Sequence, residues 1–138
     1  MLSAVLLVTG CSSFNKEWKA ALKNPIPAQD ITGPWEGRWM NEDESHGGKL
    51  RCLLTKIDQQ TYRADFHAKY KRILSFGYSV QLKGTNSNGN FEFTGEEDLG
   101  KLAGGLYTYS GTITPERFFS TYKSSYETGT LKMERPKN

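Results

Sequence analysis

The fold is decided by the stretch Tyr62-Arg63-Ala64-Asp65-Phe66-His67-Ala68-Lys69, in which apolar and polar residues alternate. Successive side chains of a β-strand point to opposite faces, so this alternation predicts a strand with one buried and one solvent-facing side. His67 falls on the polar side and is expected to be exposed. Residues 74–82 alternate in the same way, and the two segments together predict neighbouring strands.

Strong turn signals divide the rest of the chain into strands of similar length, for example at residues 41–48, 84–90 and 114–116. We predict eight strands, over residues 35–40, 49–57, 61–70, 73–83, 91–96, 105–113, 117–124 and 126–134. Short joints between consecutive strands favour an antiparallel up-and-down meander, and closing the meander into a barrel leaves no exposed edge. A two-sheet sandwich is the alternative, although it usually needs longer crossing connections.

An apolar N-terminal stretch ends in Cys11 and is too short to span a bilayer, which takes about 20 residues. The stretch resembles the lipobox of bacterial lipoprotein signal peptides, which implies removal of residues 1–10 and lipidation of Cys11. Ser12 follows the cysteine and, under the enterobacterial sorting rule, favours the outer membrane. No Lys or Arg precedes Lys16, so we expect the true translation start to lie upstream of Met1. An apolar N-terminal strand is the alternative interpretation.

Helical periodicity precedes the first strand. Phe14, Trp18 and Leu22 recur at helical spacing, which predicts a short amphipathic helix that begins at Ser13 and ends before Pro25. We expect the apolar face of this helix to pack on the barrel; a position on the membrane surface beside the lipid is the alternative. The chain then divides into a signal peptide over residues 1–10, a lipidated cysteine, helix and proline-containing linker over 11–34, and a barrel domain over 35–135.

Composition limits the classes of protein to consider. The 138 residues fit one domain, with 18 Lys and Arg against 15 Asp and Glu and a net charge of +3. Nucleic-acid binding requires a concentrated basic face, so no nucleic-acid partner is expected. Cys52 has no partner for an intrachain disulfide in a chain whose Cys11 is lipidated. Its position in a strand predicts a buried, unreactive thiol.

The first predicted strand contains Gly37-Arg38-Trp39, which resembles the Gly-x-Trp motif of lipocalins. In lipocalins this tryptophan closes one end of the barrel, so the resemblance implies that role for Trp39. The barrel region is short for a lipocalin and closer to avidin-like barrels. A wider resemblance, to small bacterial lipoproteins without an assigned activity, rests on residues 35–39, 46–52, 98–100, 103–111, 119–125 and 135–136. It implies a fold and a location rather than an activity.

Catalytic and metal-binding motifs are not recognisable in the sequence. There is no Gly-x-Ser-x-Gly elbow and no phosphate-binding loop. The run Glu42-Asp43-Glu44 with His46 could hold a divalent cation, but it lacks the alternating spacing and central glycine of a calcium loop. A solvated turn is the favoured interpretation. We therefore expect no catalysis, no metal and no cofactor.

Aromatic residues give the best functional indication, because many of the 17 alternate inward. An eight-stranded barrel is just wide enough to be filled by side chains or to hold one small ligand. Large rings favour a filled interior, whereas Ala64, Ala68 and the tyrosine hydroxyls could leave space and polar groups for a ligand. The candidate ligand-binding residues are Trp39, Phe66, Tyr78, Tyr109 and Tyr122.

Alternate hairpins of a meander share one end of a barrel, and the charged loops gather at the end expected to lie away from the lipid tether. Their candidate contact residues are Glu44, His46, Arg72, Asp98 and Lys101. Loops on a rigid scaffold commonly carry binding. We therefore expect an envelope lipoprotein, anchored in the outer membrane and facing the periplasm, whose barrel binds a small apolar ligand or a protein partner. A structural lipoprotein with a filled barrel is the alternative, and an enzyme is a distant one.

Overall fold

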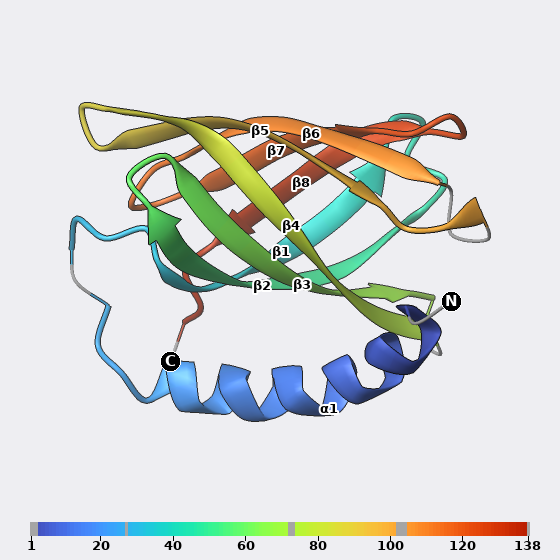
Figure 1. The fold of residues 1–138 in the computed structure, drawn as a ribbon, viewed down its shortest axis with the longest axis horizontal. Helices are drawn as coiled ribbons and strands as arrows, with labels where there is room; N and C mark the ends of the chain where they lie inside the picture. Colours follow the sequence, from blue (N-terminus) through green and yellow to red (C-terminus); the bar gives the residue numbers. More distant parts are fainter. Residues whose placement is uncertain (1–2, 27, 72–73, 102–104, 138) are drawn as a thin grey trace.

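The computed structural model describes residues 3–26, 28–71, 74–101 and 105–137. They form a helix and eight strands: α1 (Ser3–Leu22), β1 (Gly33–Asn41), β2 (Gly47–Asp58), β3 (Thr61–Tyr70), β4 (Leu74–Ser87), β5 (Asn90–Asp98), β6 (Leu106–Ile113), β7 (Phe118–Lys123) and β8 (Thr128–Glu134). Each strand pairs antiparallel with the next, and β8 pairs with β1 to close a barrel (Figure 1). The predicted eight-stranded antiparallel barrel is confirmed, and the sandwich alternative is wrong.

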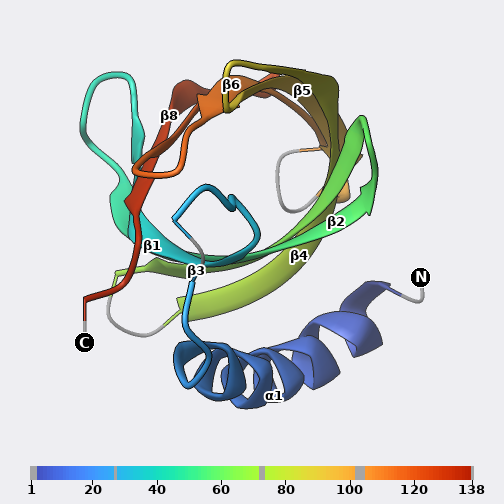
Figure 2. The same cartoon turned by 90° about the vertical axis from the view of Figure 1, so that its left-hand side faces the viewer.

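One end of the barrel is closed by the segment that precedes β1, which crosses the opening (Figure 2). Trp35 is fully buried there, and its Nε1 donates a hydrogen bond to the Ile31 carbonyl at 2.9 Å. The Arg135 guanidinium stacks on the Trp35 ring at 4.1 Å and donates to the carbonyls of Thr32 at 2.9 Å and Pro34 at 3.1 Å. Arg135, which directly follows β8, thereby connects the end of β8 to the linker and to the start of β1.

The expectation that Trp39 closes the barrel is wrong. Trp39 lies at the opposite end, where its Nε1 donates to the Lys69 carbonyl at 2.8 Å. The closing residue, Trp35, belongs to Gly33-Pro34-Trp35, which has the same Gly-x-Trp spacing. Gly33 has a φ of 98°, a backbone conformation that glycine adopts without strain as the linker turns into β1. Proximity to the linker, rather than the motif alone, decides which tryptophan closes the end.

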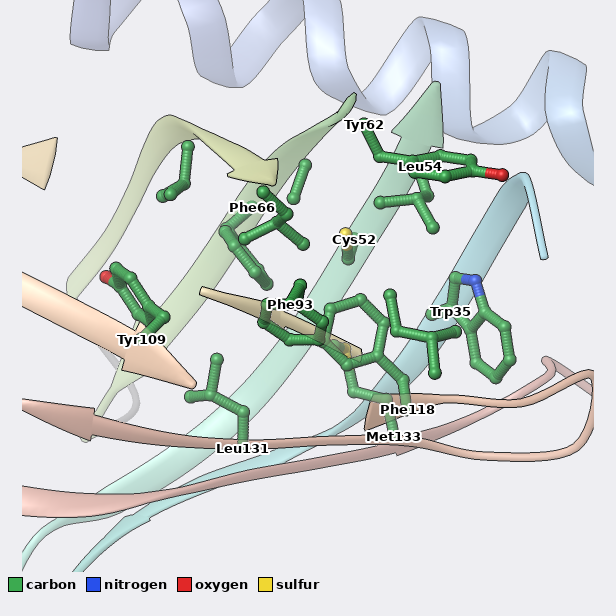
Figure 3. Packing of buried hydrophobic residues seen from close by; sticks show 14 of the residues in the cluster. Trp35, Cys52, Leu54, Tyr62, Phe66, Phe93, Tyr109, Phe118, Leu131 and Met133 are labelled. Carbon is green, nitrogen blue, oxygen red and sulfur yellow. The ribbon is translucent and has the colours of Figure 1, made fainter. Parts of the chain in front are cut away.

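The half of the barrel next to the closed end is filled with side chains (Figure 3). Phe118 lies at its centre, with ring centroids 5.8 Å from Phe93 and 6.3 Å from Phe66, both in edge-on geometry. The prediction that Cys52 is buried is confirmed, because its side chain is 0% exposed. Burial raises the pKa of the Cys52 thiol well above its ordinary value, so the thiol stays protonated.

Helix α1 packs along the outside of the barrel (Figures 1 and 2). Phe14 and Trp18 are 5% and 6% exposed, which confirms that the apolar face of the helix packs on the barrel. The sequence predicted a helix that begins at Ser13, but α1 begins at Ser3 and continues through Gly10 and Cys11. Among the described residues, no helix has both the length and the apolar character needed to cross a membrane.

The linker between α1 and β1 reverses the direction of the chain. As a result, the N-terminal end of α1 lies at the same end of the barrel as the loop between β1 and β2 (Figure 1). The expectation that the charged loops point away from the N-terminal tether is therefore wrong in this structure. The sequence indicated a stiff, proline-containing linker but not the direction in which it turns.

His67 is 4% exposed, so the expectation that it is exposed is wrong. The side chain does point outward from β3, but α1 covers it: the imidazole stacks on the Phe14 ring, with centroids 5.3 Å apart. Arg51 Nη2 lies 3.1 Å from His67 Nδ1, and the Arg51 guanidinium also packs on the rings of Phe14 and Trp18, at 5.0 and 5.2 Å. The alternation of a strand predicts whether a side chain points into or out of the barrel. It does not predict whether another element, here α1, covers an outward-pointing side chain.

This contact predicts pH-dependent docking of α1. The pKa of His67 is lowered from its ordinary value, first by burial and then by the positive charges of Arg51 and Lys69. Arg51 and Lys69 belong to the barrel, so undocking of the helix removes the burial and raises the pKa of His67 toward its ordinary value of about 6.5. As the pH falls through that range, the undocked state therefore binds more protons than the docked state. Docking is therefore favoured above about pH 6.5 and weakens as the pH falls below it.

The indole N–H signal of Trp18 in ¹H–¹⁵N NMR spectra measures this docking, and the signal of Trp35 reports whether the barrel stays folded. We expect the Trp18 signal to move on acidification before the Trp35 signal does. In His67→Gln, which has no proton to gain, this separate Trp18 transition should disappear. A transition of the same position and size in the variant would show that His67 does not control docking.

Candidate functional site

A cavity of about 210 Å³ lies in the other half of the barrel, toward the loop between β1 and β2. We call this end, opposite the closed one, the open end of the barrel. Its walls come from inward-facing positions of the strands and from two loops. The lining residues are Trp39, Ala68, Phe76, Tyr78, Leu99, Tyr107, Tyr109, Tyr122, Glu127 and Leu131. The two alternatives, a filled barrel and a barrel with a pocket, are thus both present. The half at the closed end is filled, and the other half contains a pocket.

Two small residues help to make this space. Ala68 projects into the barrel from β3 and is 3% exposed, yet it occupies far less volume than the aromatic residues around it. Gly129 is the register partner of Tyr122, and the Tyr122 phenol occupies the position where a Cβ at Gly129 would lie. Any larger residue at 129 would therefore displace the Tyr122 ring.

The structure brings the five candidate ligand-binding residues together. Trp39, Tyr78, Tyr109 and Tyr122 line the cavity. Phe66 does not line the cavity, but it packs against two residues that do: its ring centroid lies 5.2 Å from that of Tyr78 and 6.3 Å from that of Tyr109. The predicted residues thus form one cluster rather than scattered positions.

Several lining residues were not proposed from the sequence. Phe76 and Tyr107 alternate with Tyr78 and Tyr109 along their strands, so the same inward periodicity could have identified them. Glu127 belongs to the short connection between β7 and β8, where no periodicity indicates which way a side chain points. Its position depends on the closed barrel and not on any local pattern.

Buried tyrosine hydroxyls supply the polar character of the cavity. Burial raises the pKa values of Tyr78, Tyr109 and Tyr122, so these groups remain protonated and neutral at neutral pH. The Tyr122 side chain is 5% exposed, and its hydroxyl is buried without a hydrogen-bond partner. An unsatisfied buried hydroxyl costs about 1–3 kcal/mol, which a bound ligand or water could recover.

The wall of the cavity has an unpaired strand edge on one side. β4 pairs with β5 only over residues 82–87, so the first part of β4 has no partner strand toward β5. Phe76 lies in this part and is 36% exposed, and Leu74 at the rim is 58% exposed. Apolar surface is therefore accessible next to the cavity.

The loop residues proposed as contacts do not converge on the cavity. Glu44 and Lys101 are exposed, and the Asp98 carboxylate accepts a hydrogen bond from the Gly100 N–H at 2.8 Å within its own turn. Arg72 lies outside the described residues. Within the described ranges, no group of three His, Cys, Asp or Glu side chains is placed to hold a metal ion.

His46 participates in a hydrogen-bonded loop. Its Nδ1 lies 3.1 Å from Asn41 Nδ2 and 3.2 Å from Ser45 Oγ, and its ring packs edge-on against Tyr70 with centroids 5.6 Å apart. Asp43 accepts a hydrogen bond from the Ser45 N–H at 2.9 Å. These contacts fix the conformation of the loop between β1 and β2 at the rim of the barrel.

A larger hollow, of about 1250 Å³, lies on the outer surface over β7, β8 and β1. Its lining includes outward-facing charged residues such as Arg38, Lys132 and Glu134. These side chains are exposed to solvent, whereas the smaller cavity lies inside the barrel and is lined mostly by buried and half-buried side chains. We therefore regard the cavity inside the barrel as the candidate site, despite its smaller volume.

The fold defines the class of protein: a closed antiparallel β-barrel of eight strands with a helix at its side. No protein-family model and no curated protein matches the sequence. Among solved structures, the chain is similar to a de novo designed fluorescence-activating β-barrel, with 15% identity, a TM-score of 0.57, and coverage of 79% of this chain and 96% of the design. A mutant of the fluorescent protein UnaG matches with 10% identity, a TM-score of 0.45, and coverage of 78% and 97%. At these identities the similarity concerns the fold alone.

Proposed function

We propose that this protein is a binding protein, not an enzyme, that holds one small ligand in the cavity at the open end of its barrel. The observation that carries the proposal is the aromatic cavity of about 210 Å³ inside the barrel, one of whose lining residues, Tyr122, has a buried hydroxyl without a hydrogen-bond partner. Pockets for drug-sized ligands usually measure about 300–1,000 Å³, so this cavity suits a smaller molecule.

The arrangement supports binding better than a purely structural role. A barrel interior selected only for stability would be filled throughout, since empty space and unpaired polar groups both reduce stability. Here the closed half is filled, and the imperfectly filled half holds both the space and the unpaired hydroxyl. Raised tyrosine pKa values also make these hydroxyls poor proton acceptors or nucleophiles at neutral pH, which favours binding over catalysis.

Isothermal titration calorimetry with indole tests the proposal. Indole is neutral, aromatic and compact, and its N–H can donate to an oxygen in the cavity. The proposal predicts a saturable signal with one indole per chain. Heats no larger than those of dilution would contradict it.

We further propose that the protein is lipidated at Cys11 and anchored in the bacterial outer membrane, facing the periplasm. The resemblance of residues 1–11 to a lipobox supports the anchoring, and Ser12 supports the choice of membrane. Because the N-terminal end of α1 lies at the open end of the barrel, a lipid on Cys11 would hold that end close to the membrane. The ligand could then enter the cavity from the membrane side.

Replacing Cys11 with Ser should move the protein from the membrane to the soluble fraction of the cell, because the acylation site is lost. Fractionation followed by immunoblotting measures the effect. Cys52→Ser is the matched control and should leave the protein in the membrane fraction, because Cys52 is buried inside the barrel. Persistence of Cys11→Ser in the membrane fraction would refute lipidation as the anchor.

A further inference from the structure

The cavity has an unusually aromatic lining. Of its ten lining residues, six are aromatic: Trp39, Phe76, Tyr78, Tyr107, Tyr109 and Tyr122. The rings come from both sides of the barrel, and two of them, Tyr107 and Tyr122, lie 6.1 Å apart at a tilt of 41°. The face of an aromatic ring carries negative potential and attracts a cation placed over it, more strongly when water is excluded.

The charges around the cavity are also negative. Glu127 is half-buried and is the charged residue of the described lining, which contains no Lys or Arg. Burial is the main cause that raises the pKa values of Tyr107 and Tyr122, and the negative charge of Glu127 adds to it. Burial is also the main cause for Tyr109, with a smaller contribution from the charge of Glu97. Lys71 lies at this end of the barrel, but its Nζ is placed over the ring of Tyr70, 5.3 Å from the centroid, and not in the lining.

We propose that the ligand is a small organic cation of the alkylammonium class, held by the aromatic rings of the cavity and by the carboxylate of Glu127. This inference rests on the proposed function and specifies its ligand. The rings surround the alkyl groups of the cation, and the half-buried Glu127 neutralises its charge. The unpartnered Tyr122 hydroxyl is available to an oxygen atom of the same ligand, such as a hydroxyl group.

Alkylammonium groups occur in free small molecules and in lipid headgroups, and the cavity favours the free source. A phospholipid headgroup carries a phosphate next to its ammonium group. The described lining offers that phosphate no cation, and Glu127 would repel it. The volume of about 210 Å³ also suits a compact ion better than a headgroup with its glycerol.

A pair of isosteric probes isolates the role of charge. Choline and 3,3-dimethyl-1-butanol have nearly the same shape and the same hydroxyl group, but a carbon replaces the charged nitrogen in the second. We expect the full-length protein to bind choline at least about tenfold more tightly, as cation–π and carboxylate interactions in a desolvated site imply. Calorimetry measures both affinities, and sn-glycero-3-phosphocholine serves as the soluble lipid headgroup.

The variant Glu127→Gln should remove most of the preference for choline while leaving the affinity for the neutral isostere within about twofold. Glu116→Gln makes the same chemical change in the turn between β6 and β7, at the closed end, and should alter neither affinity. Circular dichroism of both variants verifies that they are folded.

The outcomes separate this inference from the proposed function. Equal affinities for the two isosteres, or a choline preference that survives in Glu127→Gln, would overturn the cationic ligand while binding of indole would still support the pocket. No binding of indole, choline or the isostere would overturn both. Tighter binding of glycerophosphocholine than of choline would contradict a free small molecule as the ligand and would assign the site to a lipid headgroup.

Discussion

Replacing Trp35 with Ala is expected to lower the free energy of unfolding by about 3–5 kcal/mol, the usual cost of truncating a large buried aromatic residue. Trp35 is 0% exposed and joins the linker to the barrel through its hydrogen bond to Ile31. Its loss would also remove the surface on which the Arg135 guanidinium stacks, at 4.1 Å. Thermal unfolding followed by circular dichroism should show a fall in Tm of roughly 10–20 °C.

Trp39→Ala is the matched control for this prediction. Trp39 lies at the open end, is only partly buried, and packs beside the cavity instead of in the filled core. We expect a stability loss of about 1–2 kcal/mol together with a loss of indole binding. Equal losses of stability in the two variants would show that Trp35 is not the residue that closes the barrel.

Replacing Ala68 with Leu is expected to abolish ligand binding, or weaken it by at least roughly tenfold, without destabilising the fold. Ala68 faces the cavity, so the added methyl and methylene groups would occupy space that the ligand needs. Burying them in existing space should leave the free energy of unfolding unchanged or raise it by about 1 kcal/mol. Calorimetry with indole and urea denaturation measure the two effects.

Ala64→Leu makes the same change four residues earlier on the same face of β3. Ala64 is 0% exposed and lies in the filled half of the barrel, so the larger side chain would overpack the core. We expect a loss of about 1–3 kcal/mol in the free energy of unfolding. If Ala68→Leu were destabilised to the same extent, the cavity would not be open space in solution.

Strand number, order and pairing could be predicted from the sequence because the signal is local and repeated. In the stretch from Tyr62 to Lys69, every second residue is apolar, and turn residues follow each such run. Once the chain forms a closed meander, the direction of each strand side chain follows from its position in the alternation. This is why Trp39, Tyr78, Tyr109 and Tyr122 could be placed in one cluster before any coordinates were known.

What the sequence could not predict depends on contacts between distant segments. The burial of His67 depends on α1, which packs on the barrel only because the linker reverses the chain. Trp35 and Trp39 occur in motifs of the same spacing, and contacts with the linker at Ile31 and with Arg135 distinguish Trp35 from Trp39. Glu127 contributes the charge of the cavity from a connection that carries no periodic signal.

The central claim is that the open end of the barrel holds a small ligand, and the three tryptophans allow a direct test. Trp39 lines the cavity, Trp35 closes the opposite end, and Trp18 belongs to α1 and is buried between this helix and the barrel. In ¹H–¹⁵N NMR spectra recorded during a titration with unlabelled indole, the account predicts that the indole N–H signal of Trp39 moves and saturates while those of Trp35 and Trp18 stay in place. An unmoved Trp39 signal, or a response confined to Trp18, would contradict it.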